Sequence, residues 1–240
     1  MSAPRFMPET LTFLRQLKEH NDRAWFRDHR DAYEAYVKRP MVELIERLAT
    51  DLPAIAPDLV AHPRTSMYRI YRDTRFSPNK APFKTHVAAI FPHRDLPKHE
   101  GAGLYVHVAA DQVFIGGGLY RPQARQLQRL REHIATHGRR LRKLTGAPVF
   151  RRSFGELSGE RLKRVPRGFP PDHEAADLLR LKQFLAGCQR TPEFATGPRF
   201  YHNLLTLFGA LAPVVHFLNE SLATGELRIE DTLPAKPPRR

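Results

Sequence analysis

Apolar residues recur at helical spacing in the first fifty positions of the chain. Within residues 9–19, Leu11, Leu14 and Leu17 fall on one face, and the following stretch keeps the same period as far as Leu48. Spacings of three and four residues place side chains on one stripe of an α-helix. The pattern therefore predicts N-terminal helices that turn one apolar face toward a core.

The period then changes from helical to extended. Residues 67–71, 85–91, 104–108 and 113–119 are short runs, rich in β-branched and aromatic residues and separated by turn residues. Residues 109–112 form a break short enough for a hairpin. Four successive strands without helices between them predict an antiparallel sheet.

Helical periodicity returns in the second half of the chain. Pro122 opens a long helix with Leu127 and Leu130 on one face, and a shorter helix is predicted over residues 174–181. Residues 182–188 show no clear period, and an extended conformation is one interpretation of them.

The last long helix is predicted over residues 198–222. Its apolar part, residues 204–218, contains Pro213 and His216. A transmembrane helix needs about twenty apolar residues, which is longer than this stretch. The sequence therefore predicts a core helix and no membrane-spanning segment.

These elements define the expected architecture. We expect an α+β single domain over residues 6–223, with a central, mainly antiparallel sheet flanked by N-terminal and C-terminal helices. The proline-rich end, residues 224–240, is predicted to be a disordered tail. The hydrophobic fraction of 41% and the charged fraction of 27% are ordinary for a soluble globular protein.

The cysteine count and the N-terminus narrow the class of protein further. Cys188 is the only cysteine among the 240 residues, which excludes an intrachain disulfide and any cysteine-based metal site. Charged residues follow the start closely, so we expect no secretory signal and a cytoplasmic location.

Positive charge is concentrated in two segments. The formal net charge is +14, and residues 121–167 carry fourteen Lys or Arg against three Glu, while residues 66–86 carry five against one Asp. Such a lopsided field attracts polyanions or anionic metabolites. There are two alternative explanations: a genome base composition that favours arginine codons, and ordinary solvated charge on helix faces.

The densest polar signal runs from one predicted strand through a turn into the next. Guanidinium groups suit phosphate or carboxylate, and Asp73 can orient one of them through a bidentate pair. The alternative is an arginine–aspartate network that only fixes the turn. The candidate ligand-binding side chains of this segment are Arg69, Tyr71, Arg72, Arg75, Lys80 and Lys84.

Strand alternation separates two faces of the predicted sheet. Tyr105, a further candidate ligand-binding residue, and His107 share one face, and Leu104, Val106 and Val108 share the other. His107 is the first candidate for proton transfer because its ordinary pKa lies near 6.5, with His86 and Asp73 as further candidates. A structural hydrogen bond is the alternative role of His107.

Three glycines, residues 116–118, end a predicted strand. Without Cβ atoms they permit close approach of a ligand, which makes Gly117 a candidate, or of another backbone. Neither a P-loop nor a dinucleotide fingerprint is present. The histidines show no metal-ligand spacing, so we expect no metal and no cofactor.

Several blocks carry a resemblance to a known family. They are residues 21–26 (NDRAWF), 67–77 (MYRIYRDTRFS), 82–86 (PFKTH), 114–118 (FIGGG) and 162–169 (LKRVPRGF). Together they resemble the family catalogued as domain of unknown function 2461. The likeness covers residues 6–222 and implies a single cytosolic α+β domain. It implies no catalytic roles, because no activity is assigned to the family.

Our leading functional hypothesis is an enzyme or binding protein with a cationic cleft for a phosphate- or carboxylate-bearing small molecule. On this hypothesis, removal of Arg72 abolishes anion binding and changes thermal stability little. The alternative is a basic interaction module that uses residues 121–167 to bind nucleic acid or an acidic protein. We expect nucleic-acid binding to be weak and non-specific.

Overall fold

The computed structural model describes residues 3–223. Its centre is a four-stranded sheet in the order β1-β2-β3-β4, in which every neighbouring pair is antiparallel. The strands are β1 (His86–Phe91), β2 (Gly103–Ala109), β3 (Val113–Leu119) and β4 (Phe184–Arg190). The predicted α+β class with a central antiparallel sheet is confirmed.

Helices precede and follow the strands along the chain. Before it come α1 (Pro8–Glu19), α2 (Arg23–Asp28), α3 (Arg30–Tyr33), the π-helical turn η1 (Glu34–Lys38), α4 (Arg39–Asp51), the 3-10 turn η2 (Leu52–Ala54) and α5 (Pro63–Ser66). The later helices are α6 (Ala124–Gly146), α7 (Pro148–Phe154), α8 (Ala176–Leu179), α9 (Glu193–Thr196) and α10 (Phe200–Ala223).

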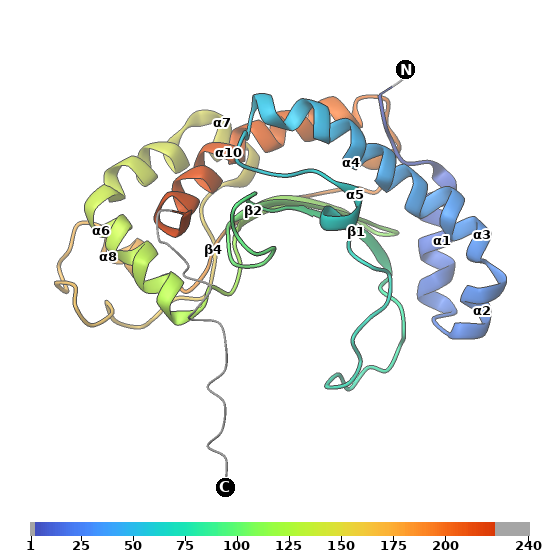
Figure 1. Ribbon diagram of the computed structural model, residues 1–240, viewed down its shortest axis with the longest axis horizontal. Helices are drawn as coiled ribbons and strands as arrows, with labels where there is room; N and C mark the ends of the chain where they lie inside the picture. Colours follow the sequence, from blue (N-terminus) through green and yellow to red (C-terminus); the bar gives the residue numbers. More distant parts are fainter. Residues whose placement is uncertain (1–2, 224–240) are drawn as a thin grey trace, which may run out of the picture.

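The helices cover one face of the sheet and leave the other open. Helix α10 packs on β3 and β2, α4 on β1, α1 on β2 and α7 on β4. Figure 1 shows α4 and α10 running above a curved sheet, while the loop before β1 descends on the opposite, concave side. The strand alternation of buried and half-buried residues follows from this arrangement, since each strand turns every second side chain toward the helices.

Residues 67–71 do not form the first strand that their composition predicts. They make only isolated antiparallel bridges, Met67 with Ala89 and Tyr71 with Phe83. The segment touches the edge of β1 at its start and then leaves the sheet for the descending loop, so no ladder forms. The fourth strand is instead β4, in the stretch whose period was unclear.

Strand β4 lacks a clear pattern because small residues occupy both of its faces. Ala186 and Cys188 turn toward the helices, whereas Gly187 faces the open side. A strand shows its period only when large apolar and polar side chains alternate.

Helix α10 is long and apolar enough to cross a membrane by length and composition, yet most of it is buried within the fold. Inside it, the Asn219 side chain accepts from the Ala102 amide at 2.8 Å and donates to the Ala102 carbonyl at 3.0 Å. These bonds tie the helix to the residue before β2. It is the core helix that the sequence predicts. The predicted tail, residues 224–240, lies outside the described residues.

Candidate functional site

The open face of the sheet has a floor of glycines and one aromatic ring. Tyr105 lies opposite Gly116, which lies opposite Gly187, and paired residues of antiparallel strands share a face. A Cβ atom at Gly187 would lie only 2.3 Å from the ring of Phe114, and one at Gly116 only 2.9 Å from it. The Phe114 ring therefore rests flat on positions where only glycine leaves room.

Gly117, the glycine singled out from the sequence, turns the other way. A Cβ there would meet the Gly103 carbonyl oxygen at 2.4 Å and the Leu211 side chain of α10 at 3.1 Å. It needs to be glycine because the strands and α10 pack closely at this point. Its backbone still borders the open face.

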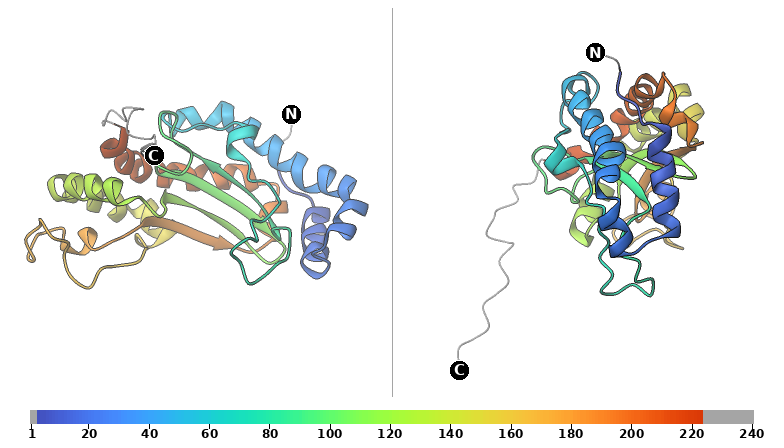
Figure 2. Two further views of the ribbon diagram at one scale, coloured as in Figure 1. Left: turned by 60° about the horizontal axis from the view of Figure 1, so that its bottom comes forward. Right: turned by 90° about the vertical axis from the view of Figure 1, so that its right-hand side faces the viewer.

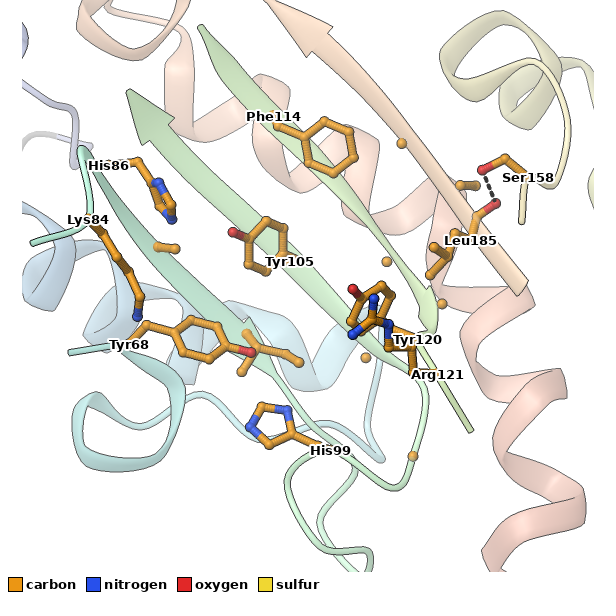
Figure 3. A pocket seen from close by; sticks show the side chains of 18 residues that line it. Tyr68, Lys84, His86, His99, Tyr105, Phe114, Tyr120, Arg121, Ser158 and Leu185 are labelled. Atoms are coloured by element: carbon orange, nitrogen blue, oxygen red, sulfur yellow. Dashed lines mark hydrogen bonds between the residues drawn. The ribbon is translucent and has the colours of Figure 1, made fainter. Parts of the chain in front are cut away.

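A cavity of about 750 Å³ lies over this floor. Figure 3 shows Tyr105 in its centre, Lys84 and His86 at one end, and Tyr120 with Arg121 at the other. None of its lining residues within the described chain is acidic. The lining side chains that carry aromatic, polar or charged groups are Tyr68, Lys84, His86, His99, Tyr105, Phe114, Tyr120, Arg121 and Ser158.

One aromatic ring in this lining carries two ammonium groups. The Lys84 Nζ atom lies 5.2 Å and the Lys98 Nζ atom 4.7 Å from the centroid of the Tyr68 ring. The His99 ring stacks on the Tyr68 ring with 6.0 Å between the centroids. The Tyr105 ring meets the Tyr68 ring edge-on with 6.3 Å between the centroids. Cation–π attraction holds each ammonium near the ring, but the two like charges also repel each other across it.

Lys84 is the cation that most clearly belongs to the cavity. Its Nζ atom donates to the Arg69 carbonyl oxygen at 2.8 Å. Burial lowers the pKa of Lys84, and the charges of Arg69 and Lys98 lower it further; no carboxylate of the described chain contributes. Burial likewise lowers the pKa of Lys98. This end of the cavity therefore holds positive charge that no acidic group of the described residues neutralises.

A chain of polar rings runs across the floor of the cavity. The Tyr105 hydroxyl lies 3.2 Å from His107 Nδ1, and the rings of His86 and His107 are 5.0 Å apart. Burial, followed by the charge of His86, lowers the pKa of His107 to about 4, although Asp111 opposes the shift. Burial raises the pKa of Tyr105 to about 12. Near neutral pH both groups are uncharged hydrogen-bonding partners.

That state bears on proton transfer. The hydrogen bond between the Tyr105 hydroxyl and Nδ1 of the neutral His107 fixes the tyrosine ring within the cavity, and His107 itself is not among the lining residues. His86 does line the cavity, and burial and then the charge of Lys84 lower its pKa. Of the two predicted histidines, His86 is the one that a ligand can reach.

The descending loop holds three further cations of the segment, and their side chains bond within the loop. Arg75 forms a bidentate pair with Asp73 at 3.0 and 2.7 Å, as the sequence suggested for one arginine. Arg72 donates to the Ala81 carbonyl at 3.3 Å, and Lys80 donates to the Thr74 carbonyl at 3.0 Å. In the described chain, none of these side chains lines the cavity.

Arg69 and Tyr71 face a second, smaller hollow of about 350 Å³. It lies against the N-terminal helices and is bordered by Phe26, Tyr33 and Glu34 among others. The polar segment predicted to form one site is therefore divided between a loop, a side hollow and the main cavity.

Several cavity residues had no place in the sequence-based site. His99 stands in the connection between β1 and β2, which has no periodicity, and Arg121 and Ser158 come from connections after β3 and α7. Lys98, from the same connection as His99, does not line the cavity but places its ammonium over the Tyr68 ring, which does. The available signal was the clustering of charge and aromatic residues just beyond strand ends, where loops meet a sheet face.

The histidines do not assemble into a metal centre. Within residues 3–223, no three His, Cys, Asp or Glu side chains gather closely enough to hold an ion. The chemistry available at the cavity is that of an amine, a guanidinium group, phenols, imidazoles, a serine hydroxyl and aromatic surfaces.

Fold and cavity together define an α+β protein whose antiparallel sheet is covered by helices on one face and offers a ligand-sized, aromatic cavity on the other. The chain belongs to the family described as Conserved hypothetical protein (DUF2461), which matches residues 9–217. The resemblance seen in the sequence motifs is thereby confirmed. No curated protein matches the chain.

Proposed function

We propose that the concave face of the sheet binds a small anionic molecule with a flat apolar body. The observation that carries this proposal is the pair of ammonium groups, Lys84 and Lys98, held over the Tyr68 ring with no acidic partner among residues 3–223. Neighbouring like charges disfavour each other's charged forms, and an anion bound between them reverses that effect. A carboxylate or phosphate beside Tyr68 supplies that neutralisation.

The rest of the cavity favours an apolar body for the ligand. Its volume of about 750 Å³ falls in the range typical of small-molecule sites. Tyr105, Phe114 and Tyr120 present ring surfaces, and aromatic contacts of this kind favour a flat partner. The anionic group then lies at the Lys84 end, and the ring system lies over the glycine floor.

The alternative of a basic interaction module has weaker support. In the predicted basic segment, Arg131 is buried and donates to the carbonyls of Leu179 and Leu181. Arg140 pairs with Glu220 and Arg142 with Asp177. Part of the positive charge therefore holds α6 to its neighbours. Binding to nucleic acid and a cytoplasmic location stay predictions from the sequence.

The test is direct binding of 2-naphthoate, measured through its fluorescence, with the uncharged 2-naphthamide as a matched ligand. We expect Lys84→Met to weaken 2-naphthoate binding by about 10- to 100-fold, which corresponds to a charge-assisted hydrogen bond of about 1.5–3 kcal/mol. Binding of 2-naphthamide should be weaker from the start and insensitive to the substitution.

The control is Lys80→Met. Lys80 also donates to a backbone carbonyl, but it lies on the exposed loop and does not line the cavity. The Lys80→Met variant should bind 2-naphthoate with the affinity of the unchanged protein. Equal loss of binding in both variants, or equal affinity for acid and amide, would show that general positive charge and not this cavity attracts the ligand.

A further inference from the structure

We infer that the ε-amino group of Lys84 is a nucleophile, which condenses with the carbonyl of a 2-oxo acid bearing a flat apolar side chain and forms an imine. The inference rests on the proposed function, since the same anion site must first hold the acid. It goes further by assigning a covalent step to one atom.

The surroundings of the Lys84 amine are those that such a nucleophile needs. The amine lies at the end of a cavity large enough for a ligand, and the nearest hydrogen-bond partner is a backbone carbonyl, that of Arg69, at 2.8 Å. A carbonyl oxygen accepts a hydrogen bond from the amine and so orients it. Unlike a carboxylate, it carries no negative charge that would stabilise the ammonium form. Lysines become nucleophilic when they are desolvated or placed beside another cation.

Both conditions are met at this position. Burial, together with the charges of Arg69 and Lys98, lowers the pKa of Lys84, which increases the share of free amine at neutral pH. The Tyr68 ring, 5.2 Å from Nζ, shields the amine on one side. Lys80 offers the contrast within the same segment: its ammonium is exposed and lies outside the cavity.

The second lysine on the ring selects the class of carbonyl compound. A 2-oxo acid carries its carboxylate on the carbon next to the carbonyl. With the carbonyl carbon at Lys84, the carboxylate lies beside the Tyr68 ring, and the Lys98 ammonium, 4.7 Å from the centroid of that ring and near enough to lower the pKa of Lys84, attracts it. The apolar side chain of the acid then extends over Tyr105 and the glycine floor, as the proposed function requires.

The step balances without any further reactant. The free amine attacks the carbonyl carbon and forms a carbinolamine. The protonated hydroxyl then leaves as water, and the nitrogen lone pair forms the C=N double bond. Starting from the ammonium form, the products are a protonated imine and one water molecule, so no net proton is released. His86, at the same end of the cavity (Figure 3), is a neutral base that can take the ammonium proton and return it to the leaving hydroxyl.

The experiment is reductive trapping with phenylpyruvate and cyanoborohydride at neutral pH, followed by mass-spectrometric peptide mapping. Cyanoborohydride reduces the protonated imine to a stable amine on whichever lysine formed it. We expect Lys84 to be labelled at least about tenfold faster than Lys80, because binding in the cavity raises the local concentration of the carbonyl. Excess 3-phenylpropanoate, which has no carbonyl to condense, should slow the labelling of Lys84 alone.

Two variants separate charge from nucleophilicity. Lys84→Arg restores the cation without the amine: it should lose the adduct completely, while binding 3-phenylpropanoate better than Lys84→Met does. Lys80→Met should keep the Lys84 adduct. Both variants are compared at equal folded fraction, measured by circular dichroism, so that loss of the adduct is not mistaken for unfolding.

The outcomes distinguish this inference from the proposed function. Binding of 3-phenylpropanoate without any Lys84 adduct from phenylpyruvate overturns the nucleophile and leaves the anion site standing. Absence of both overturns both. Equal labelling of all exposed lysines also overturns the inference, because it shows ordinary amine chemistry and not a reactive site.

Discussion

The exposed loop over residues 72–82 and the cavity end at Lys84 belong to one continuous basic segment, yet their charged side chains have different kinds of partner. In the loop, Arg75 pairs with Asp73, and Arg72 and Lys80 donate to carbonyls of the loop itself. At the cavity end, Lys84 is half-buried and shares the Tyr68 ring with Lys98. Figure 2 shows the loop projecting away from the sheet.

The difference teaches that charge density along a chain does not by itself define a binding site. The loop satisfies its cations within its own turn, which a solvated hairpin can do without a ligand. The cavity end collects cations from separate segments and places them in a partly desolvated space. Desolvation strengthens the attraction between such a group and an incoming anion.

The largest effect expected from this comparison concerns two phenylalanines of the same segment. Phe83 is 2% exposed and stacks on Phe26 at 4.1 Å, whereas Phe76 at the loop is 93% exposed. We expect Phe83→Ala to lower the free energy of unfolding by about 3–5 kcal/mol and Phe76→Ala to change it by less than about 0.5 kcal/mol. Urea unfolding measures both.

Asn21 explains why the boundary falls at Phe83. Its side chain accepts from the Phe83 amide at 3.0 Å and donates to the Phe83 carbonyl at 3.1 Å, so the base of the loop is fixed to the turn between α1 and α2. Equal destabilisation by the two alanine substitutions would contradict the division into an anchored base and a free loop.

The next effect is a pH dependence that belongs to the floor of the cavity and not to the loop. Burial lowers the pKa of His107 to about 4 from an ordinary value of 6.5. Between these values the unfolded chain binds a proton that the folded chain does not, so stability falls as the pH falls through this window. The full shift corresponds to about 3.4 kcal/mol, and screening by solvent at the partly exposed ring reduces the expected loss to about 2–3 kcal/mol.

Unfolding by urea at several pH values tests this dependence. His107→Gln should flatten the stability profile between pH 6.5 and 4. In the loop, the hydrogen bonds of Arg75 hold the pKa of Asp73 at about 2, so Asp73→Asn should leave the same window unchanged. An unaltered slope in His107→Gln would place the titration elsewhere.

The smallest effect is expected for Arg72→Ala. Its hydrogen bonds, to the Ala81 carbonyl at 3.3 Å and to the Ser77 hydroxyl at 3.4 Å, are long and lie within the loop. Thermal unfolding should shift by the equivalent of about 1 kcal/mol or less. In contrast to the expectation from the sequence alone, 2-naphthoate binding should persist, because Arg72 does not line the cavity. Loss of 2-naphthoate binding in this variant would show that the loop takes part in the binding site.

Local patterns in the sequence were sufficient for most of the fold. The alternation around Tyr105 and His107, the hairpin between β2 and β3 and the apolar face of α10 each follow from spacing over a few residues. They were recognisable because a helix or strand imposes its period on the side chains that it buries. Where small residues occupy both faces, as around Gly187 in β4, that signal vanished.

For the site, the sequence determined which chemical groups are present, and the tertiary structure decided which of them meet. In the sequence, nothing separates the five cations of residues 66–86 as candidates for the anion site. The bridge between Tyr71 and Phe83 closes the loop, so that the cations inside it are separated from Lys84. Lys98 reaches the same Tyr68 ring from the β1–β2 connection. No local pattern records such a meeting, because it depends on where distant backbone segments cross and not on the period of either one.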